Sequence, residues 1–296
     1  MASLPENRVA GAVGCVGVVV HPSRDIAHPL SRLRGWAERN GVGVIQAPIA
    51  GQHRTVAETG DLDHCDLVVS IGGDGTMLAA IRAASAVDLP VLGVTCGSLG
   101  VLTTVTAEGL PRALERFRSD DWIPRVLPAL TVARGNGPDL FALNDVCVLR
   151  SGIGQVRVSS CVDGVLFTRM AGDGCVVSTP VGSSAYALAA GGPLITPDTD
   201  AYLLTPLPTH GGFRQPLVIS AGSQLTLEVS AGMGGARLEA DGQIVEGEPQ
   251  SLTIGLRPGV ATTVGFSDQE PLFEALRRRQ IITDSPRITA DQRRLP

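Results

Sequence analysis

The segment of this chain best suited to chemistry is a glycine-rich pentapeptide that follows an apolar run at 67–71 and precedes a predicted helix at 77–84. Glycines at such a turn let backbone N–H groups approach phosphate oxygens, because no Cβ stands in the way. We predict phosphate binding by the residues around its single acid, namely Gly72, Gly73, Gly75 and Thr76.

The acid of this pentapeptide, Asp74, would repel an anion bound beside it. It is better explained as a base or as a magnesium contact than as a phosphate ligand. The segment therefore indicates phosphoryl transfer, with Asp74 as catalytic base or, alternatively, as a metal-binding or positioning group. The alternative without a function is that Asp74 is the N-cap of an ordinary helix.

A second cluster lies at 173–186 and is followed by Gly191-Gly192-Pro193. Its small residues and hydroxyls would expose hydrogen-bond donors, and Tyr186 offers a flat face for a base. The neighbouring Asn144 has the amide that pairs with an adenine edge, and the carboxylate of Asp145 suits ribose hydroxyls. Together they predict a nucleoside site.

Composition limits the classes of function. The net charge of −5 and the 3% of aromatic residues argue against nucleic acid as a partner. No apolar stretch is long enough for a membrane span and no signal peptide is recognisable, so we expect a cytoplasmic protein without a membrane partner. The six cysteines include no C-x-x-C pair and no histidine at zinc spacing, so we predict no structural metal site.

All 24 basic residues are arginine, since the chain contains no lysine. This excludes a Walker A loop, whose lysine reaches the terminal phosphates, and it excludes Schiff-base chemistry. Phosphate charge must be neutralised by arginine, backbone N–H groups or a metal ion.

The order of apolar and turn-rich segments predicts an α/β protein of two domains. In residues 1–125, short apolar runs alternate with helical segments, as in a Rossmann-like parallel sheet whose ligands bind beyond the carboxyl ends of its strands. Residues 126–268 carry short β-branched segments separated by glycine, which predicts an antiparallel β-rich domain. Residues 269–296 are expected to form a helix stub that returns to the first domain, and a loose tail.

These motifs, in this order, resemble the ATP-dependent NAD kinase family, which belongs to the superfamily of diacylglycerol and sphingosine kinases. The resemblance extends from about residue 16 to residue 279. Its motifs are Gly72–Thr76, Asn144-Asp145, the block Asp173–Pro193 and Asp241-Gly242-Gln243.

The resemblance implies an enzyme of NADP biosynthesis that uses ATP and Mg²⁺, with its active site between the two domains. Asp74 would take the proton of the acceptor's ribose hydroxyl, which in NAD kinases is the 2′-hydroxyl of the adenosine, while the glycines hold the donor phosphates. Family members are commonly homodimers or homotetramers.

The resemblance also assigns the acceptor site. Asn144, Ser184, Ala185 and Tyr186 would seat the adenosine. Asp145 and Asp173 would contact the sugar or the nicotinamide end, in some arrangements across a subunit interface. His210 matches a family histidine, although the glycines around it fit a plain loop equally well.

Several positions depart from the family. Val181 stands where a hydroxyl residue is usual in the acceptor site, Thr95 and Val101 replace Asn and Phe, and Asp145 is one methylene shorter than the usual Glu. These changes motivate the alternative of a kinase for a smaller nucleoside, nucleotide or polyol. A nucleotide sensor without turnover and a lipid kinase are further alternatives. The intact Asp74 argues against a sensor, and the block at 173–193 argues against a lipid kinase.

Three other features have simpler interpretations. His21, between an apolar run and Pro22, is expected to be a turn histidine. The arginines at 277–279 are expected to form a solvated basic helix end. Asp241-Gly242 fits a hairpin turn, and only the family match makes it a candidate site element.

Overall fold

The computed structural model describes residues 13–49, 53–97, 101–103 and 105–288. The chain divides into a first unit, residues 1–125 with 261–296, and a second unit, residues 126–260. The sequence had placed 261–268 in the second domain. The difference arises from strand β16 (Ser251–Gly265), which begins in the second unit and pairs with the first unit at Thr262 and Thr263.

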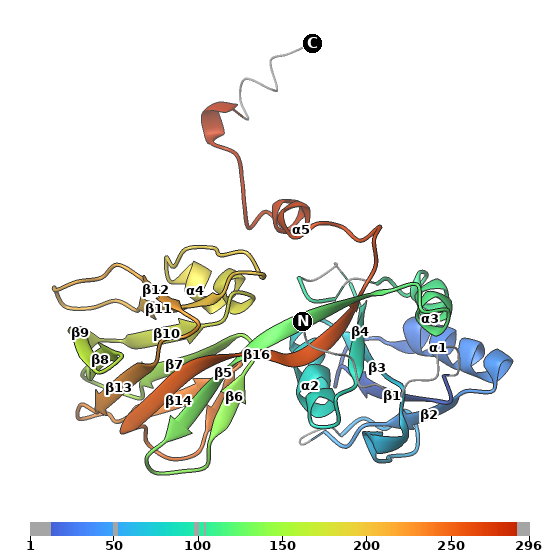
Figure 1. Ribbon diagram of the computed structural model, residues 1–296, viewed down its shortest axis with the longest axis horizontal. Helices are drawn as coiled ribbons and strands as arrows, with labels where there is room; N and C mark the ends of the chain where they lie inside the picture. The colour runs from blue at the N-terminus through green and yellow to red at the C-terminus, as the bar shows by residue number, and fades with distance from the viewer. Residues whose placement is uncertain (1–12, 50–52, 98–100, 104, 289–296) are drawn as a thin grey trace. The chain divides into compact units, whose positions relative to one another are not determined.

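The first unit is a parallel sheet with helices on both faces (Figure 1). The strand order is β2-β1-β3-β4, with the end of β16 beside β4. Apolar side chains of α1 and α3 belong to one core with the sheet, whereas α2 contacts β1, β3 and β4 from the other side. The strands are β1 (Cys15–Val20), β2 (Gly43–Gln46), β3 (Leu67–Gly72) and β4 (Pro90–Thr95), and the helices are α1 (Ala27–Asn40), α2 (Asp74–Ser85), α3 (Leu110–Arg118) and α5 (Leu272–Arg278).

The carboxyl ends of the central strands meet at one edge of this sheet. The N–H of His21, just after β1, donates to the carbonyl of Ile71 in β3 at 2.9 Å. The N–H of Cys96, just after β4, donates to the carbonyl of Gly72 at 2.9 Å. The segments that follow β1, β3 and β4 are therefore neighbours, and the glycine-rich turn lies among them, as open parallel sheets predict for a ligand site.

The second unit consists of two antiparallel sheets that share one apolar core. Alternate residues of facing strands supply this core, including Val146, Val148, Val177, Leu225 and Leu227, as the period of two in a strand requires. One sheet contains β5 (Ile123–Arg134), β6 (Leu140–Ala142), β8 (Val156–Val162), β9 (Val165–Gly172), β13 (Leu225–Ser230) and β16; the other contains β7 (Asp145–Arg150), β10 (Gly174–Ser178), β11 (Ala201–Pro206), β12 (Leu217–Ser220), β14 (Ala236–Ala240) and β15 (Gln243–Val245).

A short helix, α4 (Tyr186–Ala189), covers the outer face of the second sheet. Its Ala187 packs with Cys147 and Val176, whose side chains point away from the shared core. Along β7 and β10, Asp145 pairs with Ser178 and, four residues further on, Leu149 pairs with Gly174. This register decides which predicted site residues can meet.

These elements agree with the predicted fold class, an α/β domain followed by an antiparallel β-rich domain. Among the described residues, none of the helices has the length and hydrophobicity that crossing a membrane requires.

Candidate active site

The glycine-rich pentapeptide is the end of a strand joined to the first turn of a helix. Gly72 closes β3, Gly73 is the N-cap of α2, and residues 74–76 form the first turn. The first intrahelical hydrogen bond runs from the N–H of Met77 to the carbonyl of Gly73 at 3.0 Å. The N–H groups of residues 74–76 therefore precede the ladder of helical bonds and remain able to bind an anion.

Glycine stands at positions 72 and 75 of this segment for different structural reasons. A Cβ on Gly72 would lie 2.2 Å from Oγ1 of Thr76, so the fold itself requires glycine there. A Cβ on Gly75 would meet no described atom within 4 Å, and Gly75 is not among the described glycines with positive φ. The absence of a side chain at Gly75 leaves open space beside the first turn of α2.

The expected alternative that Asp74 is an N-cap is wrong. Asp74 is the first helical residue and makes no capping bond with its side chain. Its carboxylate instead accepts backbone N–H groups from Val101 (3.1 Å), Leu102 (3.1 Å) and Thr103 (3.3 Å). Three consecutive donors fix the carboxylate beside the open space at Gly75, and they tie the start of α2 to the segment after β4.

Asp74 also faces a cation. Nη1 of Arg279, directly after α5, lies 3.4 Å from its Oδ2. The two side chains are 29% and 31% exposed, so the carboxylate is accessible to solvent. The expectation that residues 277–279 form a solvated basic helix end is confirmed, since all three arginines are exposed at the end of α5. Arg277 pairs there with Asp284 and Arg278 with Glu270.

In the second unit, the predicted acceptor residues Asn144 and Asp145 are held by Asp241. This residue has φ = 49° at the turn between β14 and β15. Its carboxylate accepts the N–H groups of Leu143 (3.0 Å), Asn144 (2.7 Å) and Asp145 (3.3 Å). A hairpin turn is therefore present, as composition predicted, and its acid orients the backbone of the Asn144-Asp145 pair.

The loop at 179–184 packs against the same backbone. The hydroxyl of Thr179 donates to the carbonyl of Leu143 at 2.7 Å, and a Cβ on Gly182 would lie 1.9 Å from the carbonyl oxygen of Asn144. The hydroxyl of Ser184 donates to the carbonyl of Val181 at 2.9 Å. The loop thus places Val181, Ser184 and Ala185 beside the Asn144 segment.

Asp145 is almost fully buried, at 6% exposure. Burial and the nearby charge of Asp241 raise its pKa to about 6. Tyr186 is 42% exposed at the start of α4, and burial together with the charges of Cys147, Glu239 and Asp145 raises its pKa. The side chain of Asn144 is half-buried and has no hydrogen-bond partner among the described residues. Asp145 and Tyr186 therefore lie close enough to interact, and we call them, with the adjacent Asn144, the Asn144 group.

Asp173 and His210 lie elsewhere in the second unit. Asp173 joins β9 to β10 and pairs with Arg150 at 2.5 Å, at the opposite end of β10 from Ser178, the register partner of Asp145. Four residues of strand correspond to about 13 Å. The structure therefore separates Asp173 from Asp145 by this length of strand.

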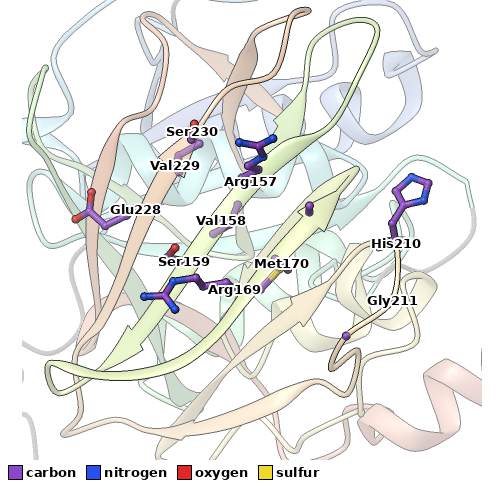
Figure 2. A pocket seen from close by; sticks show the side chains of 12 residues that line it. Arg157, Val158, Ser159, Arg169, Met170, His210, Gly211, Glu228, Val229 and Ser230 are labelled. Atoms are coloured by element: carbon purple, nitrogen blue, oxygen red, sulfur yellow. The ribbon is translucent and has the colours of Figure 1, made fainter.

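His210 borders a pocket of about 500 Å³ (Figure 2). Its backbone N–H donates to the carbonyl of Ala171 at 3.0 Å, next to the end of β9. Arg157 of β8, Arg169 of β9 and Glu228 of β13 line the same pocket. The pocket lining is mixed, with two guanidinium groups, one carboxylate and several apolar side chains.

Comparisons with known proteins agree with these motifs. Residues 16–122 match the sequence profile of the ATP-NAD kinase N-terminal domain, and residues 143–262 match that of the ATP-NAD kinase C-terminal domain. The chain belongs to the ATP-NAD kinase family. The expectation of an ATP-dependent kinase of the NAD kinase type is thereby confirmed.

Curated relatives of the family align over most of the chain. The NAD kinase of Heliobacterium modesticaldum is 38% identical over 239 residues, which are 77% of this chain and 84% of that protein. The NAD kinase of Acidobacterium capsulatum is 34% identical over 253 residues, which are 81% of this chain and 87% of that protein.

Solved structures confirm the NAD kinase-like fold. An NAD kinase from Archaeoglobus fulgidus in complex with ATP has a TM-score of 0.73 and 26% identity, and the match covers 91% of this chain and all of that one. Yeast NADH kinase complexed with NADH has a TM-score of 0.77, 18% identity and coverage of 92% and 89%. At that identity the second likeness concerns the fold alone.

Proposed function

We propose that this member of the family transfers the γ-phosphate of ATP to the 2′-hydroxyl of the adenosine ribose of NAD. The observation that carries the proposal is the accessible carboxylate of Asp74, fixed by three backbone donors beside the open first turn of α2. The relatives named NAD kinase support NAD as the acceptor.

In the proposed reaction, the acceptor's 2′-oxygen attacks the γ-phosphorus while the bond to the β,γ-bridging oxygen breaks and ADP leaves. The proton of the hydroxyl passes to the Asp74 carboxylate, which must exchange its contact with Arg279 for the acceptor. The N–H groups of residues 74–76 stabilise the donor phosphates, and Gly75 leaves room for them.

The described residues offer Mg²⁺ one carboxylate ligand, that of Asp74, and no complete set of protein ligands. Among the described residues, no group of three or more His, Cys, Asp or Glu side chains could hold a metal ion. An ion that prefers phosphate oxygens and waters needs only one or two protein ligands, and Asp74 is the carboxylate available beside the turn. When bound, Mg²⁺ would neutralise part of the charge of the donor phosphates.

We assign the adenosine of the acceptor to the group around Asn144. The unpartnered amide of Asn144 would bind the adenine edge, the exposed ring of Tyr186 would stack on the base, and Asp145 would contact the ribose. The methyl groups of Val181 replace a hydroxyl donor, and the carbonyl of Val181 already accepts from Ser184.

Asp173 requires a different role, because about 13 Å of strand separates it from Asp145. His210 lies near Asp173, since its N–H donates to the carbonyl of Ala171. We propose that they contact the nicotinamide end of an acceptor bound to a neighbouring copy, in a homodimer or homotetramer. Cross-linking and light scattering would test this assembly, and a monomer with full activity would contradict it. The cytoplasmic location expected from the sequence stays a prediction.

The deciding experiment is an acceptor panel assayed by mass. The purified chain is incubated with ATP, Mg²⁺ and, separately, NAD, NADH, adenosine, AMP and small polyols. We expect one added PO₃H unit on NAD above all other acceptors. A faster reaction on a smaller acceptor would favour an altered acceptor site instead, and no product on any acceptor would favour a nucleotide sensor.

A further inference from the structure

We propose that Arg24, in the segment after β1, is the side chain that neutralises the terminal phosphates of the donor. The inference rests on the proposed function, in which the turn after β3 binds those phosphates. It answers a question that the sequence raises, since a chain without lysine must supply this charge from another group.

The guanidinium of Arg24 lies at the phosphate turn. Its Nη1 donates to the carbonyl of Cys96, just after β4, at 3.2 Å. A Cβ on Gly73, the N-cap of α2, would lie 3.4 Å from the same nitrogen. Arg24 therefore spans the edge of the sheet from β1 to β4 and borders the N-cap whose following N–H groups are free of helical bonds.

His21 fixes the backbone from which Arg24 projects. Its Nδ1 accepts the N–H of Ser23 at 3.1 Å and the N–H of Arg24 at 3.0 Å. Burial and the charges of Arg24 and Arg54 lower the pKa of His21, which favours the neutral ring that these two bonds require. The prediction of a turn histidine is confirmed, and the turn that it builds presents Arg24.

A second contact holds this turn from the side of β2. Nη1 of Arg54 donates to the carbonyl of Arg24 at 2.6 Å and to that of His21 at 3.4 Å. Arg54 is itself held by the buried Gln46 at the end of β2, whose side-chain amide donates to the carbonyl of Arg54 at 2.7 Å. His21 and Arg54 are thus positioning residues that support the phosphate contact of Arg24.

Arg24 forms no ion pair with a carboxylate among the described residues. Within the same ranges this also holds for Arg54, and the adjacent Asp25 uses its carboxylate to accept the N–H of Ala27 at 2.9 Å. The arginines near the C-terminal helix are paired, by contrast. Two cations without acidic partners at a phosphate-binding edge attract a polyanion.

During transfer, negative charge accumulates on the β,γ-bridging oxygen as its bond to the γ-phosphorus breaks. Arg24 stabilises that charge and the non-bridging oxygens, while the proton of the acceptor's hydroxyl still passes to Asp74. Arg24 therefore contributes both to donor binding and to the barrier for transfer, and it has no role in acceptor binding.

The test compares Arg24→Gln, Arg24→Lys and the charge-matched control Arg32→Gln, which removes an exposed arginine of α1. Each variant is assayed for NADP formation with varied ATP and with varied NAD, and its affinity for inorganic tripolyphosphate is measured by calorimetry. For Arg24→Gln we expect kcat/KM for ATP to fall about 10- to 100-fold and tripolyphosphate affinity about 10-fold, with KM for NAD nearly unchanged. Arg24→Lys should recover part of both losses, and Arg32→Gln should match the wild type.

The positioning role of His21 has its own test. His21→Ala removes the acceptor for two N–H groups, whereas His21→Asn places an amide oxygen near the site of Nδ1. We expect tripolyphosphate affinity to fall several-fold in the first variant and to recover in the second. Equal affinities in wild type, His21→Ala and His21→Asn would remove His21 from this role.

The outcomes separate this inference from the proposed function. An active wild type with unchanged ATP kinetics and unchanged tripolyphosphate affinity in Arg24→Gln would overturn the role of Arg24 alone. A wild type that phosphorylates no acceptor would overturn the proposed function, and tripolyphosphate binding would still decide whether Arg24 binds phosphate. Should Arg24→Gln unfold, the folded Arg24→Lys provides the decision. Lower tripolyphosphate affinity together with lower kcat/KM for ATP would support the role of Arg24, and wild-type values of both would overturn it.

Discussion

Two aspartates of this kinase make the same set of hydrogen bonds in different units. Asp74 accepts the backbone N–H groups of residues 101–103, and Asp241 accepts those of residues 143–145. In each case a carboxylate at the start of a helix or at a hairpin turn fixes three consecutive donors from a distant segment. The pattern alone therefore does not identify a catalytic acid.

The surroundings distinguish them. Asp74 is 29% exposed, lies at the first turn of α2 and faces Arg279. Asp241 lies beside the buried Asp145 and raises its pKa, and the segment that it holds carries the free amide of Asn144. We infer that Asp74 acts directly on a ligand and that Asp241 acts through the residues it orients.

The largest expected effect is on kcat, and it should separate the direct role of Asp74 from the orienting role of Asp241. Asp74→Asn keeps the shape of the side chain but removes the proposed proton acceptor, so kcat should fall about 10²- to 10⁴-fold with ATP affinity retained. Steady-state kinetics and calorimetry with ATP measure the two quantities. Asp241→Asn is the matched control, and we expect it to raise KM for NAD more than it lowers kcat. Equal losses of kcat in both variants would erase the distinction.

The next prediction concerns the buried neighbour of Asp241. The pKa of Asp145 rises from an ordinary value of 3.8 to about 6, so the folded state binds this proton more tightly than the unfolded state. Asp145 therefore lowers the free energy of unfolding as pH rises from about 4 to about 6, by roughly 3 kcal/mol in total. Asp145→Asn should remove this loss, and denaturant unfolding at pH 4, 6 and 8 measures it.

Asp163, in the same unit, is a control because its pKa is shifted in the opposite direction to that of Asp145. Asp163, at the exposed turn after β8, accepts the N–H of Gln224 at 2.8 Å, and this bond lowers its pKa. Its contribution to stability is present above the unfolded pKa and is lost as pH falls through the folded value. Asp163→Asn should therefore destabilise more at neutral pH than in acid. A pH-independent effect of Asp145→Asn would show that the carboxyl group does not titrate in this range.

Glycine-to-alanine substitutions test the space beside the backbone at Asn144, in the second unit, and beside the first turn of α2, in the first unit. A Cβ on Gly182 would lie 1.9 Å from the carbonyl oxygen of Asn144, so Gly182→Ala must displace the segment that Asp241 holds. We expect a loss of about 1–3 kcal/mol in the free energy of unfolding, together with weaker NAD binding. Gly75→Ala is the control, since no described atom lies within 4 Å of its new Cβ. Its stability should stay near that of the wild type, and any loss of activity would report contact with the donor.

Sequence patterns predicted the glycine-rich turn at Asp74 and the hairpin turn at Asp241, but not the residues that bond to these two aspartates. An apolar run followed by glycines predicts β3 and the turn into α2, because strand, turn and helix form from neighbouring residues. The donors to Asp74 lie 27 to 29 residues further on, and Arg279 lies 205 residues away, so no local pattern reveals them. From the sequence alone, an N-cap role for Asp74 remained a possible alternative, which these contacts remove.

The register between strands also could not be predicted from the sequence. Asp145 and Asp173 both matched acceptor motifs, yet the pairing of β7 with β10 places Asp145 opposite Ser178 and Gly174 opposite Leu149. Helix α3 also went unrecognised, although Pro111 in its first turn is typical of a helix start. Arg24 carried no motif at all, because its place depends on three strands that meet at one edge.

The smallest expected effect tests whether backbone donors suffice to hold Asp74. Arg279→Gln removes an ion pair whose partners are both about one-third exposed, so the free energy of unfolding should change by less than about 1 kcal/mol. Arg116→Gln is the control. Arg116 is 16% exposed, pairs with Asp121 and Asp268 and lies 4.4 Å from the ring centre of Phe266, so its loss should destabilise more.

Amide hydrogen exchange of residues 101–103 supplies the structural measurement. In Arg279→Gln these amides should stay protected, because the Asp74 carboxylate still accepts their N–H groups. In Asp74→Ala, which removes the acceptor, the protection should be lost, as it should be for residues 143–145 in Asp241→Ala. Loss of protection already in Arg279→Gln would mean that the two aspartates are held differently, one by a cation and the other by the backbone.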